Sequence, residues 1–393
     1  MPTYPRRRFI PTSRRVGRVR YTSPPTRWRR EKAATVNKRL KKLREKIAEK
    51  EIDAMFITQS ENRRYLSGFH GTAGYLIITR KKAVLATDFR YTEQAAAEAP
   101  DFEILRISGN IKDWFPGLLG DMGIKSLGFE GEDVTFDFHA RLRDAIKKKQ
   151  IAIKLIAVNN LVENIRAVKE PEEIGLIRRA SAITDAAFEY VEEKIRAGMT
   201  EKQVAWELEK ALREKGSQPL PFDIIVGSGP NAALPHARPS DRVISEGEPI
   251  VIDMGARYAG YASDLSRTVC VGKADARLKQ VYNTVLDAQT AAMAIICRGM
   301  TGHQADSAAR EIIKKAGYGE AFGHSLGHGV GLAEHELPYL SPSAEEPLTD
   351  GMVFTVEPGI YLSGWGGVRI EDTAVMEKGK AIPLTGARKA AYR

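Results

Sequence analysis

Two aspartates stand at positions where a carboxylate is costly unless something binds it. Asp253 ends the apolar run 250–252, which is typical of a buried strand, and Asp264 follows eleven residues later. The sequence between them, Tyr-Ala-Gly-Tyr at 258–261, indicates a turn. Two strands joined by such a turn are antiparallel neighbours, which would bring both carboxylates together. The alternative is that each aspartate only caps a loop.

A glycine-rich segment holds three of the chain's seven histidines, His324, His328 and His335. Two histidines four apart on a helix can bind zinc, but this segment lacks the glutamate of the HExxH metalloprotease pattern. Its glycines also argue against a regular helix. A single histidine is usually structural, whereas three of them, beside two aspartates with no evident partner, favour a functional site.

Two glutamates complete the set of acids. Glu357 ends the apolar run 353–356, and Glu371 directly follows Ile370. Either glutamate alone would be an ordinary strand-end residue that faces solvent. Four carboxylates and one imidazole, however, suit a pair of hard or borderline divalent ions. Without metals, four converging carboxylates would repel one another, so the acids themselves predict a cofactor.

The elements that must position these residues fall into two segments. Residues 34–162 alternate short apolar runs with amphipathic stretches, which predicts an α/β domain. Residues 163–393 form the second segment, where Pro171 with the acids that follow it is typical of a helix start. Strands are predicted at 54–58, 75–79, 83–87, 103–105, 126–129, 151–156, 222–226, 249–254 and 262–271, and helices at 36–51, 136–148, 171–196, 201–215, 278–297 and 303–316.

Composition excludes several classes of protein. Of 393 residues, 43% are hydrophobic and 28% are charged, which is ordinary for a globular protein. No run approaches the roughly 18 apolar residues of a membrane span, and no secretory signal is evident. The two cysteines, Cys270 and Cys297, form no CxxC pair, so disulfide scaffolding and thiolate zinc sites are not expected. A reducing, cytoplasmic location is predicted, without membrane association.

The net charge of +10 belongs to one end of the chain. Residues 1–30 contain ten arginines and no acidic residue, so the remainder is close to neutral. Together with its prolines, this composition predicts a basic, disordered tail over residues 1–33. The tail could instead contact nucleic acid or acidic surfaces, serve as an organelle transit segment, or result from a start codon placed too early.

The order and spacing of these residues resemble the pita-bread metallopeptidases, which include aminopeptidase P, prolidase and methionine aminopeptidase. The resemblance covers nearly all of residues 36–380, and the segments 62–69 and 87–94 resemble the N-terminal domain of the Xaa-Pro enzymes. Methionine aminopeptidases lack that domain, and creatinase lacks the full metal set. The implied fold is α/β (α+β) in the two-domain creatinase/aminopeptidase P architecture, with a creatinase-like domain at 34–162 and a pita-bread catalytic domain at 163–393.

The resemblance also implies roles for individual residues. The metal ligands would be Asp253, Asp264, His328, Glu357 and Glu371. Catalytic roles fall on His236, His324, His335 and Glu357, and substrate contacts on His236, His335, Tyr361 and Arg369, with Arg369 more architectural than chemical. The cofactor would be two divalent ions, Mn²⁺ first, with Co²⁺, Zn²⁺ or Fe²⁺ as alternatives.

The main functional hypothesis is an Xaa-Pro aminopeptidase that releases the first residue of proline-containing peptides through a metal-bridged hydroxide. The alternative is an Xaa-Pro dipeptidase, or prolidase, with the same metals and a subsite that requires a free carboxylate after proline. A third hypothesis is a non-catalytic pita-bread protein that binds nucleic acid through its basic tail. A homodimer is expected because relatives are commonly dimers.

Overall fold

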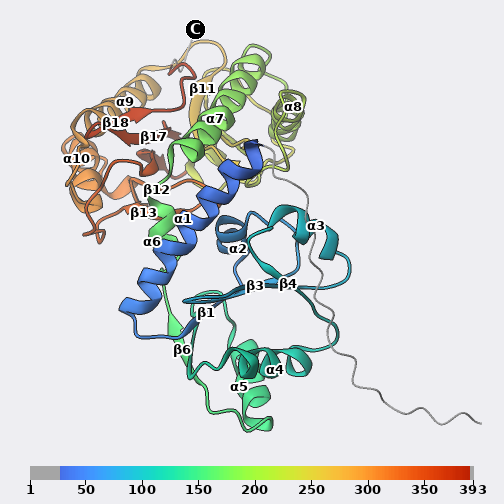
Figure 1. Cartoon of the computed structure of the whole chain (residues 1–393). Helices are drawn as coiled ribbons and strands as arrows, with labels where there is room; N and C mark the ends of the chain where they lie inside the picture. The colour runs from blue at the N-terminus through green and yellow to red at the C-terminus, as the bar shows by residue number, and fades with distance from the viewer. Residues whose placement is uncertain (1–26, 390–393) are drawn as a thin grey trace, which may run out of the picture. The chain divides into compact units, whose positions relative to one another are not determined.

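The computed structural model describes residues 27–389, with side chains from residue 35 onward (Figure 1). This part of the chain forms two compact units, one ending at Val162 and the other beginning at Glu163. Each unit has its own sheets and its own core, which agrees with the predicted mixture of helices and strands.

The first unit is built on a six-stranded mixed sheet in the order β4-β3-β2-β1-β5-β6. The strands are β1 (Ala54–Ile57), β2 (Tyr75–Thr79), β3 (Ala83–Thr87), β4 (Glu103–Arg106), β5 (Ser126–Glu130) and β6 (Lys154–Val158). The helices are α1 (Arg27–Glu49), α2 (Ser60–Ser67), α3 (Thr92–Glu98), α4 (Ile111–Met122) and α5 (Phe136–Lys148). β1, β2 and β3 are antiparallel, as the predicted hairpin requires, whereas β4, β5 and β6 each pair in parallel with a neighbour.

Helix α1 is longer than predicted. Its apolar face is the expected one, because Val36, Leu40, Leu43 and Ile47 are all buried. It begins at Arg27, however, and not at Val36, so the end of the predicted disordered tail of residues 1–33 is helical. No proline occurs between Pro25 and Pro100, and the sequence from Arg27 to Glu49 is rich in arginine, lysine, glutamate and alanine, which favour helix. The rest of that tail, residues 1–26, lies outside the described residues.

The second unit contains a three-stranded sheet, β11-β8-β7, a five-stranded sheet, β13-β12-β14-β17-β18, and two small hairpins. Its strands are β7 (Ile225–Ser228), β8 (Pro249–Met254), β9 (Arg257–Tyr258), β10 (Tyr261–Ala262), β11 (Leu265–Cys270), β12 (Gly327–Gly329), β13 (Glu336–Leu340), β14 (Val353–Val356), β15 (Gly359–Leu362), β16 (Gly366–Arg369), β17 (Asp372–Glu377) and β18 (Lys380–Pro383). Its helices are α6 (Glu163–Ala167), α7 (Pro171–Glu192), α8 (Glu201–Glu214), α9 (Ala276–Ile295) and α10 (Gly302–Lys315), with 3₁₀ turns η1 (Gly229–Ala233) and η2 (Gly319–Ala321).

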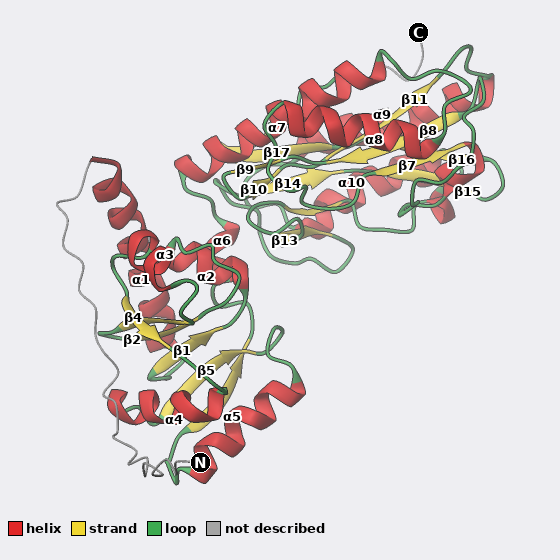
Figure 2. Ribbon diagram, turned by 90° about the vertical axis from the view of Figure 1, so that its right-hand side faces the viewer, coloured by secondary structure: helices red, strands yellow, loops and turns green. Residues whose placement is uncertain are grey.

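Two pairs of helices enclose the strands of this unit. The apolar faces of α7 and α8 pack with β7, β8 and β11 in one hydrophobic cluster. Those of α9 and α10 pack with β14 and β17 in another. Figure 1 shows the two helix pairs on opposite sides of the strands, and Figure 2 shows α7 and α8 beside the strand layer. The strands therefore form an inner layer, and polar side chains at their ends can meet.

Most predicted elements of the second unit are present with small shifts. β8 has the predicted bounds, and the capping box at Thr200 and Gln203 is formed at the start of α8. The strand predicted at 222–226 begins instead at Ile225, because Pro219 and Pro221 precede it and proline cannot donate to a sheet. Most of the strands after residue 320 had no prediction, since their runs are short and interrupted by glycine.

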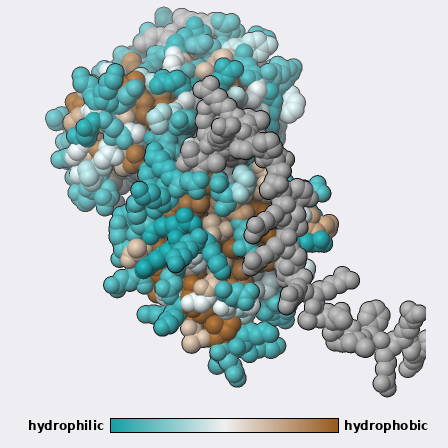
Figure 3. Space-filling model, in the orientation of Figure 1, coloured by the Kyte–Doolittle hydropathy of each residue, from teal (hydrophilic) through white to brown (hydrophobic). Residues whose placement is uncertain are grey.

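Polar residues cover most of the face shown in Figure 3, with small hydrophobic patches between them. Within residues 27–389, no helix has the length and apolar character that crossing a bilayer demands. Cys270 and Cys297 are both free thiols, as expected from the absence of a CxxC pair.

Candidate metal centre

Asp253 and Asp264 are brought together by an antiparallel strand pair. Asp253 lies in β8 opposite Ser266 of β11, and Asp264 directly precedes β11. The chain between them forms the β9–β10 hairpin, whose two central residues, Ala259 and Gly260, have φ angles of 46° and 89°. Positive φ at both positions is the backbone of a type I′ turn, the commonest way to close a two-residue hairpin. The predicted turn and the predicted pairing are both confirmed.

His328, Glu357 and Glu371 come from the second sheet. His328 lies in β12, Glu357 follows β14, and Glu371 precedes β17. A register shift after His328 marks a bulge, a feature that re-aims side chains. Gly327 beside it must lack a side chain, since a Cβ there would collide with the carbonyl oxygen of Thr355. The close approach of Thr355 explains why residue 327 of the histidine-rich segment is a glycine.

Hydrogen bonds join the two sheets at the site. The Glu371 amide donates to the Ser266 carbonyl over 3.0 Å. Arg267, which is fully buried, donates to the Asp372 carboxylate over 2.8 Å and also to the Glu371 carbonyl. β11 and β17 are thereby held together, which places Glu371 next to Asp264.

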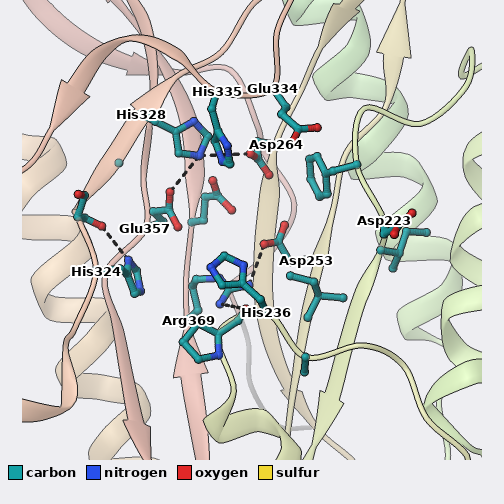
Figure 4. Close-up of a pocket in the computed structure, with 18 of the residues that line it drawn as sticks. Asp223, His236, Asp253, Asp264, His324, His328, Glu334, His335, Glu357 and Arg369 are labelled. Atoms are coloured by element: carbon teal, nitrogen blue, oxygen red, sulfur yellow. Dashed lines mark hydrogen bonds and ion pairs between the residues drawn. The ribbon is translucent and has the colours of Figure 1, made fainter. Parts of the chain in front are cut away.

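The result is a compact cluster of metal-binding groups (Figure 4). One ligand atom each from Asp264, His328 and Glu371 lies within 4.8 Å of the other two. The Nε2 atom of His328 is 3.3 Å from Oε1 of Glu357 and 3.7 Å from Oδ2 of Asp264. Asp253 faces the same cavity but is held by Arg369, whose guanidinium is 2.7 Å from its Oδ2.

The cluster has unpaired ligand atoms where cations would bind. Among the described residues, no hydrogen-bond partner is found for Oδ1 of Asp253, Oδ1 of Asp264 or Oε1 of Glu371, all of which are buried. Nδ1 of His328 donates to the Gly329 carbonyl over 3.1 Å, which directs Nε2 towards the carboxylates. Buried oxygens without donors are costly, and this donor set of carboxylates and one imidazole fits divalent metal ions.

The pKa values of the carboxyl groups in the cluster also favour a bound cation. Burial, together with the charge of the other acids, raises the pKa of both Asp264 and Glu371 well above the usual carboxyl range. Burial would also raise the pKa of Glu357, but the hydrogen bond and charge of His328 outweigh it and lower that pKa to about 2. The cluster therefore brings together more carboxyl groups than the protein alone can keep ionised, and a bound cation would favour their ionised forms.

Hydrogen bonds link the side chains of Arg369, Tyr361 and His324 to one another behind the cluster. The Tyr361 hydroxyl lies 2.9 Å from Nε2 of His324 and accepts from NH1 of Arg369 over 3.0 Å. Nδ1 of His324 donates to the Ser325 carbonyl over 2.8 Å. Both nitrogens of His324 thus have protein partners, and Tyr361 does not line the cavity. The substrate contact expected of Tyr361 stays a prediction, and the architectural role expected of Arg369 is consistent with its buried position.

His236 and His335 lie at the cavity wall. The His335 ring packs edge-on against His328, with ring centroids 4.0 Å apart. Partial burial and the charge of His328 lower the pKa of His335 to about 4, so its ring is neutral at pH 7. His236 lies in the loop after η1, and in Figure 4 it stands across the cluster from His328 and His335.

These residues surround one cavity of about 700 Å³, a typical volume for a small-molecule site. Its wall includes all the predicted site residues except Tyr361, namely His236, Asp253, Asp264, His324, His328, His335, Glu357, Arg369 and Glu371. Three of these residues lie on the strands β8, β12 and β16, and the other six lie on six different connecting segments, which thus meet in one place.

Sequence reasoning missed several residues that support the site. Glu201 is fully buried and accepts hydrogen bonds from the amides of Ser228 and Ser240, which bracket the loop that carries His236. Glu336, next to His335, is buried against Arg166 and Lys169. The only sequence signal for Glu336 was its place beside a site histidine, and Glu201 looked like an ordinary acid in the first turn of a helix.

Comparison with known proteins agrees with this geometry. Residues 175–378 match the family described as metallopeptidase family M24, and residues 39–168 match the creatinase/prolidase N-terminal domain. The chain is 38% identical to an Xaa-Pro dipeptidase of Pyrococcus horikoshii, over 89% of this chain and 97% of that protein.

Solved structures give the same result. The structure of an Xaa-Pro dipeptidase from Bacillus anthracis matches with a TM-score of 0.87 and 41% identity, over 91% of this chain and 99% of that one. The structure of an X-Pro aminopeptidase from Thermotoga maritima matches with a TM-score of 0.82 and 40% identity, over 90% and 99%. The expected architecture is confirmed: a creatinase-type N-terminal domain precedes a pita-bread domain. The chain belongs to metallopeptidase family M24.

Proposed function

We propose that the chain is a metal-dependent Xaa-Pro dipeptidase. The observation that carries the metal-dependent part is the set of three buried carboxylate oxygens, on Asp253, Asp264 and Glu371, that have no protein donor within the described chain. Support for Xaa-Pro specificity comes from the relatives, whose printed names are Xaa-Pro dipeptidase or aminopeptidase.

The order of the two peptidase hypotheses changes. From sequence, the aminopeptidase was the main hypothesis, whereas the named relatives favour the dipeptidase. The similarity to the Thermotoga aminopeptidase keeps the aminopeptidase as the second candidate. A non-catalytic binding function has no support, because the family is one of peptidases and all five proposed ligand positions line one cavity.

Five residues are proposed to hold two divalent ions, Mn²⁺ first. Asp253 would bind one ion, His328 and Glu357 the other, and Asp264 and Glu371 would bind both. When bound, the ions lower the pKa of a water molecule and polarise the scissile carbonyl. Arg369 holds one oxygen of Asp253 and so leaves the other free for an ion.

The remaining steps fall to protein side chains. Glu357, with its pKa of about 2, is ionised and can accept a proton from the attacking water. Proline leaves as a secondary amine, and its nitrogen bore no proton in the peptide. The proton accepted by Glu357 must therefore be delivered to the departing nitrogen. The neutral ring of His335, together with His236, stands at the wall where it can donate a hydrogen bond to the substrate.

One experiment tests the proposal directly. The purified chain is assayed with Mn²⁺, Co²⁺, Zn²⁺ or Fe²⁺ against Ala-Pro, Ala-Pro-Ala and Ala-Ala. We expect metal-dependent turnover of Ala-Pro, slower turnover of Ala-Pro-Ala, and none of Ala-Ala. A higher kcat/KM for Ala-Pro-Ala than for Ala-Pro would replace the dipeptidase by the aminopeptidase. Equal turnover of Ala-Ala would overturn the Xaa-Pro specificity.

Three further expectations stay predictions. They are the homodimer, the cytoplasmic location, and contact between nucleic acid and the basic residues at the start of the chain, most of which lie outside the described part.

A further inference from the structure

The cavity wall contains two arginines, and they differ in what they contact. Arg369 is buried, and its guanidinium donates to Asp253, Ser266, Tyr361 and the Pro235 carbonyl. Arg238 is exposed, and among residues 27–389 no hydrogen bond or ion pair is found for its side chain. No other lysine or arginine of the described chain lines this cavity. Arg238 is thus a cation available to a ligand.

The backbone that carries Arg238 is held on both sides. The Pro235 carbonyl accepts from Arg369 over 3.1 Å, and the buried Ala237 donates its amide to the Leu234 carbonyl over 3.1 Å. On the other side, the amide and hydroxyl of Ser240 donate to the buried Glu201 over 3.0 and 2.6 Å. A loop anchored in this way presents its side chains at a fixed place, which lowers the entropy cost of binding.

Apart from the two arginines and the histidines, the ionisable side chains of this cavity wall are acids or Tyr339. Besides the acids of the metal centre, the cavity is lined by Asp223 and Glu334. A dipeptide carries an ammonium group at one end and a carboxylate at the other, with the scissile bond between them. One residue spans at most about 3.6 Å, so a carboxylate on the residue after the scissile bond lies about one residue length from the reacting carbonyl. Within the described chain, Arg238 is the only lysine or arginine of this wall without a protein partner, so its guanidinium is available to that carboxylate.

We propose that Arg238 binds the free carboxylate of the proline residue in Xaa-Pro and so determines the preference for dipeptides. This inference rests on the proposed dipeptidase function and adds the side chain that would bind the C-terminal carboxylate of the substrate. A guanidinium can form two parallel hydrogen bonds to a carboxylate. Phe222, Ile224 and Pro239, which line the same cavity, offer apolar surface to the proline ring.

The test compares a substrate that has the carboxylate with one that lacks it. Ala-Pro and Ala-prolinamide are assayed with the metal-loaded wild type, Arg238→Gln and Arg238→Lys. We expect the wild type to prefer Ala-Pro, and Arg238→Gln to reduce that preference about tenfold, through KM rather than kcat. Arg238→Lys keeps the charge and should recover part of the preference. Raising the salt concentration should raise KM for Ala-Pro in the wild type more than in Arg238→Gln.

Arg196→Gln is the matched control, because it removes the same charge at an exposed position that does not line the cavity. It should leave the Ala-Pro preference as in the wild type. A preference that is equal in wild type and Arg238→Gln, or a loss that affects both substrates alike, would overturn the role of Arg238 while the dipeptidase function stands.

A binding measurement separates the two proposals. Proline and prolinamide are titrated as ligands into the Mn²⁺-loaded wild type and Arg238→Gln. If the wild type binds proline more tightly than prolinamide and the variant does not, the role of Arg238 is supported, even without turnover of Ala-Pro. Absence of Ala-Pro turnover would overturn only the dipeptidase function. Equal affinities for proline and prolinamide in the wild type would overturn the carboxylate contact.

Discussion

Arg369 donates from NH2 to Oδ2 of Asp253 over 2.7 Å, and the second oxygen of that aspartate has no donor within the described chain. The guanidinium therefore fixes the carboxylate in one orientation without neutralising its metal-facing side. It does so from a buried position, with further bonds to Ser266 and Tyr361. An ion that binds Asp253 meets a ligand that is already oriented, which is the usual effect of groups behind a metal ligand.

Replacing Arg369 should weaken metal binding before it affects the fold. Arg369→Lys keeps the positive charge but cannot reach Asp253, Ser266 and Tyr361 at once. We expect the affinity for Mn²⁺ to fall about 10- to 100-fold, measured by calorimetric titration of the metal-free protein. Thermal unfolding of the metal-free variant is the control for folding. An unchanged Mn²⁺ affinity would show that Arg369 does not orient Asp253.

Glu357 is the residue whose loss should stop turnover. Glu357→Gln keeps the size of the side chain but removes both the negative charge and the ability to accept a proton. We expect kcat for Ala-Pro to fall at least about 100-fold, the lower end of the range for acid–base groups, while the circular dichroism spectrum is unchanged. Residual turnover near the wild-type level, with metal bound, would refute the proton-transfer role.

Metal binding should release protons. In the metal-free protein, burial and mutual repulsion raise the pKa of Asp264 and of Glu371. These carboxyls therefore keep protons at a pH where exposed acids are ionised, and an incoming cation must displace them. Titration with Mn²⁺ at mildly acidic pH, in two buffers with different ionisation enthalpies, should give different apparent heats, and affinity should rise with pH. Identical heats in both buffers would contradict this prediction.

The same two carboxyls set how the metal-free protein responds to pH. A folded-state pKa above the unfolded value stabilises the folded state at low pH, and that stabilisation is lost as pH rises through the folded value. Mn²⁺ should therefore raise the unfolding temperature more at neutral than at mildly acidic pH. Thermal unfolding with and without metal at both pH values measures this difference.

Glu336 should be important for stability through its buried contacts. Burial would raise its pKa, but Lys169 and Arg166 outweigh that effect and lower it below the ordinary glutamate value of 4.5. Glu336→Gln removes the buried carboxylate that Arg166 and Lys169 both contact and should cost about 3 kcal/mol of unfolding free energy, measured by urea titration. Glu311→Gln, which removes an exposed ion pair to Lys314, is the matched control and should cost under about 1 kcal/mol.

The sign of the pH effect at Glu336 follows from its lowered pKa. The stabilisation is present above the ordinary glutamate pKa and is lost as pH falls through the folded-state value. The difference in stability between the wild type and Glu336→Gln should therefore shrink on acidification below about pH 4.5. A difference that stays constant down to pH 3 would argue that the cost of the substitution is not electrostatic.

Sequence patterns predicted the elements whose signals are local. The β2–β3 hairpin and helix α5 have the predicted bounds because each has a clear period and clear ends. The acids Asp253 and Glu357 were conspicuous because each closes an apolar run. Most of the strands after residue 320 were not predicted, since β12 and β15 are short and contain glycines, and the close approach of Thr355 that requires Gly327 in β12 is formed only by the fold.

Supporting contacts of the site could not be predicted for a different reason. The partners of Arg369, Glu201 and Glu336 are brought together only by the tertiary fold. A single sequence indicates that Glu201 is acidic and begins a helix, but not that Ser228 and Ser240, on either side of a distant loop, will donate to it. For Tyr361, the resemblance suggested a contact with substrate, which stays a prediction, but gave no sign that its hydroxyl contacts Arg369 and His324.

The metal centre draws on strands from distant parts of the chain: Asp253 of β8 and Arg369 at the end of β16, which contact each other, are 116 positions apart. Contacts over such separations form late, after much chain entropy has been lost. During synthesis, no segment before residue 371 can make the complete centre, because Glu371 is the last of the five proposed ligands along the chain. A growing chain therefore lacks a complete set of proposed ligands until Glu371 and the strands around it have been made.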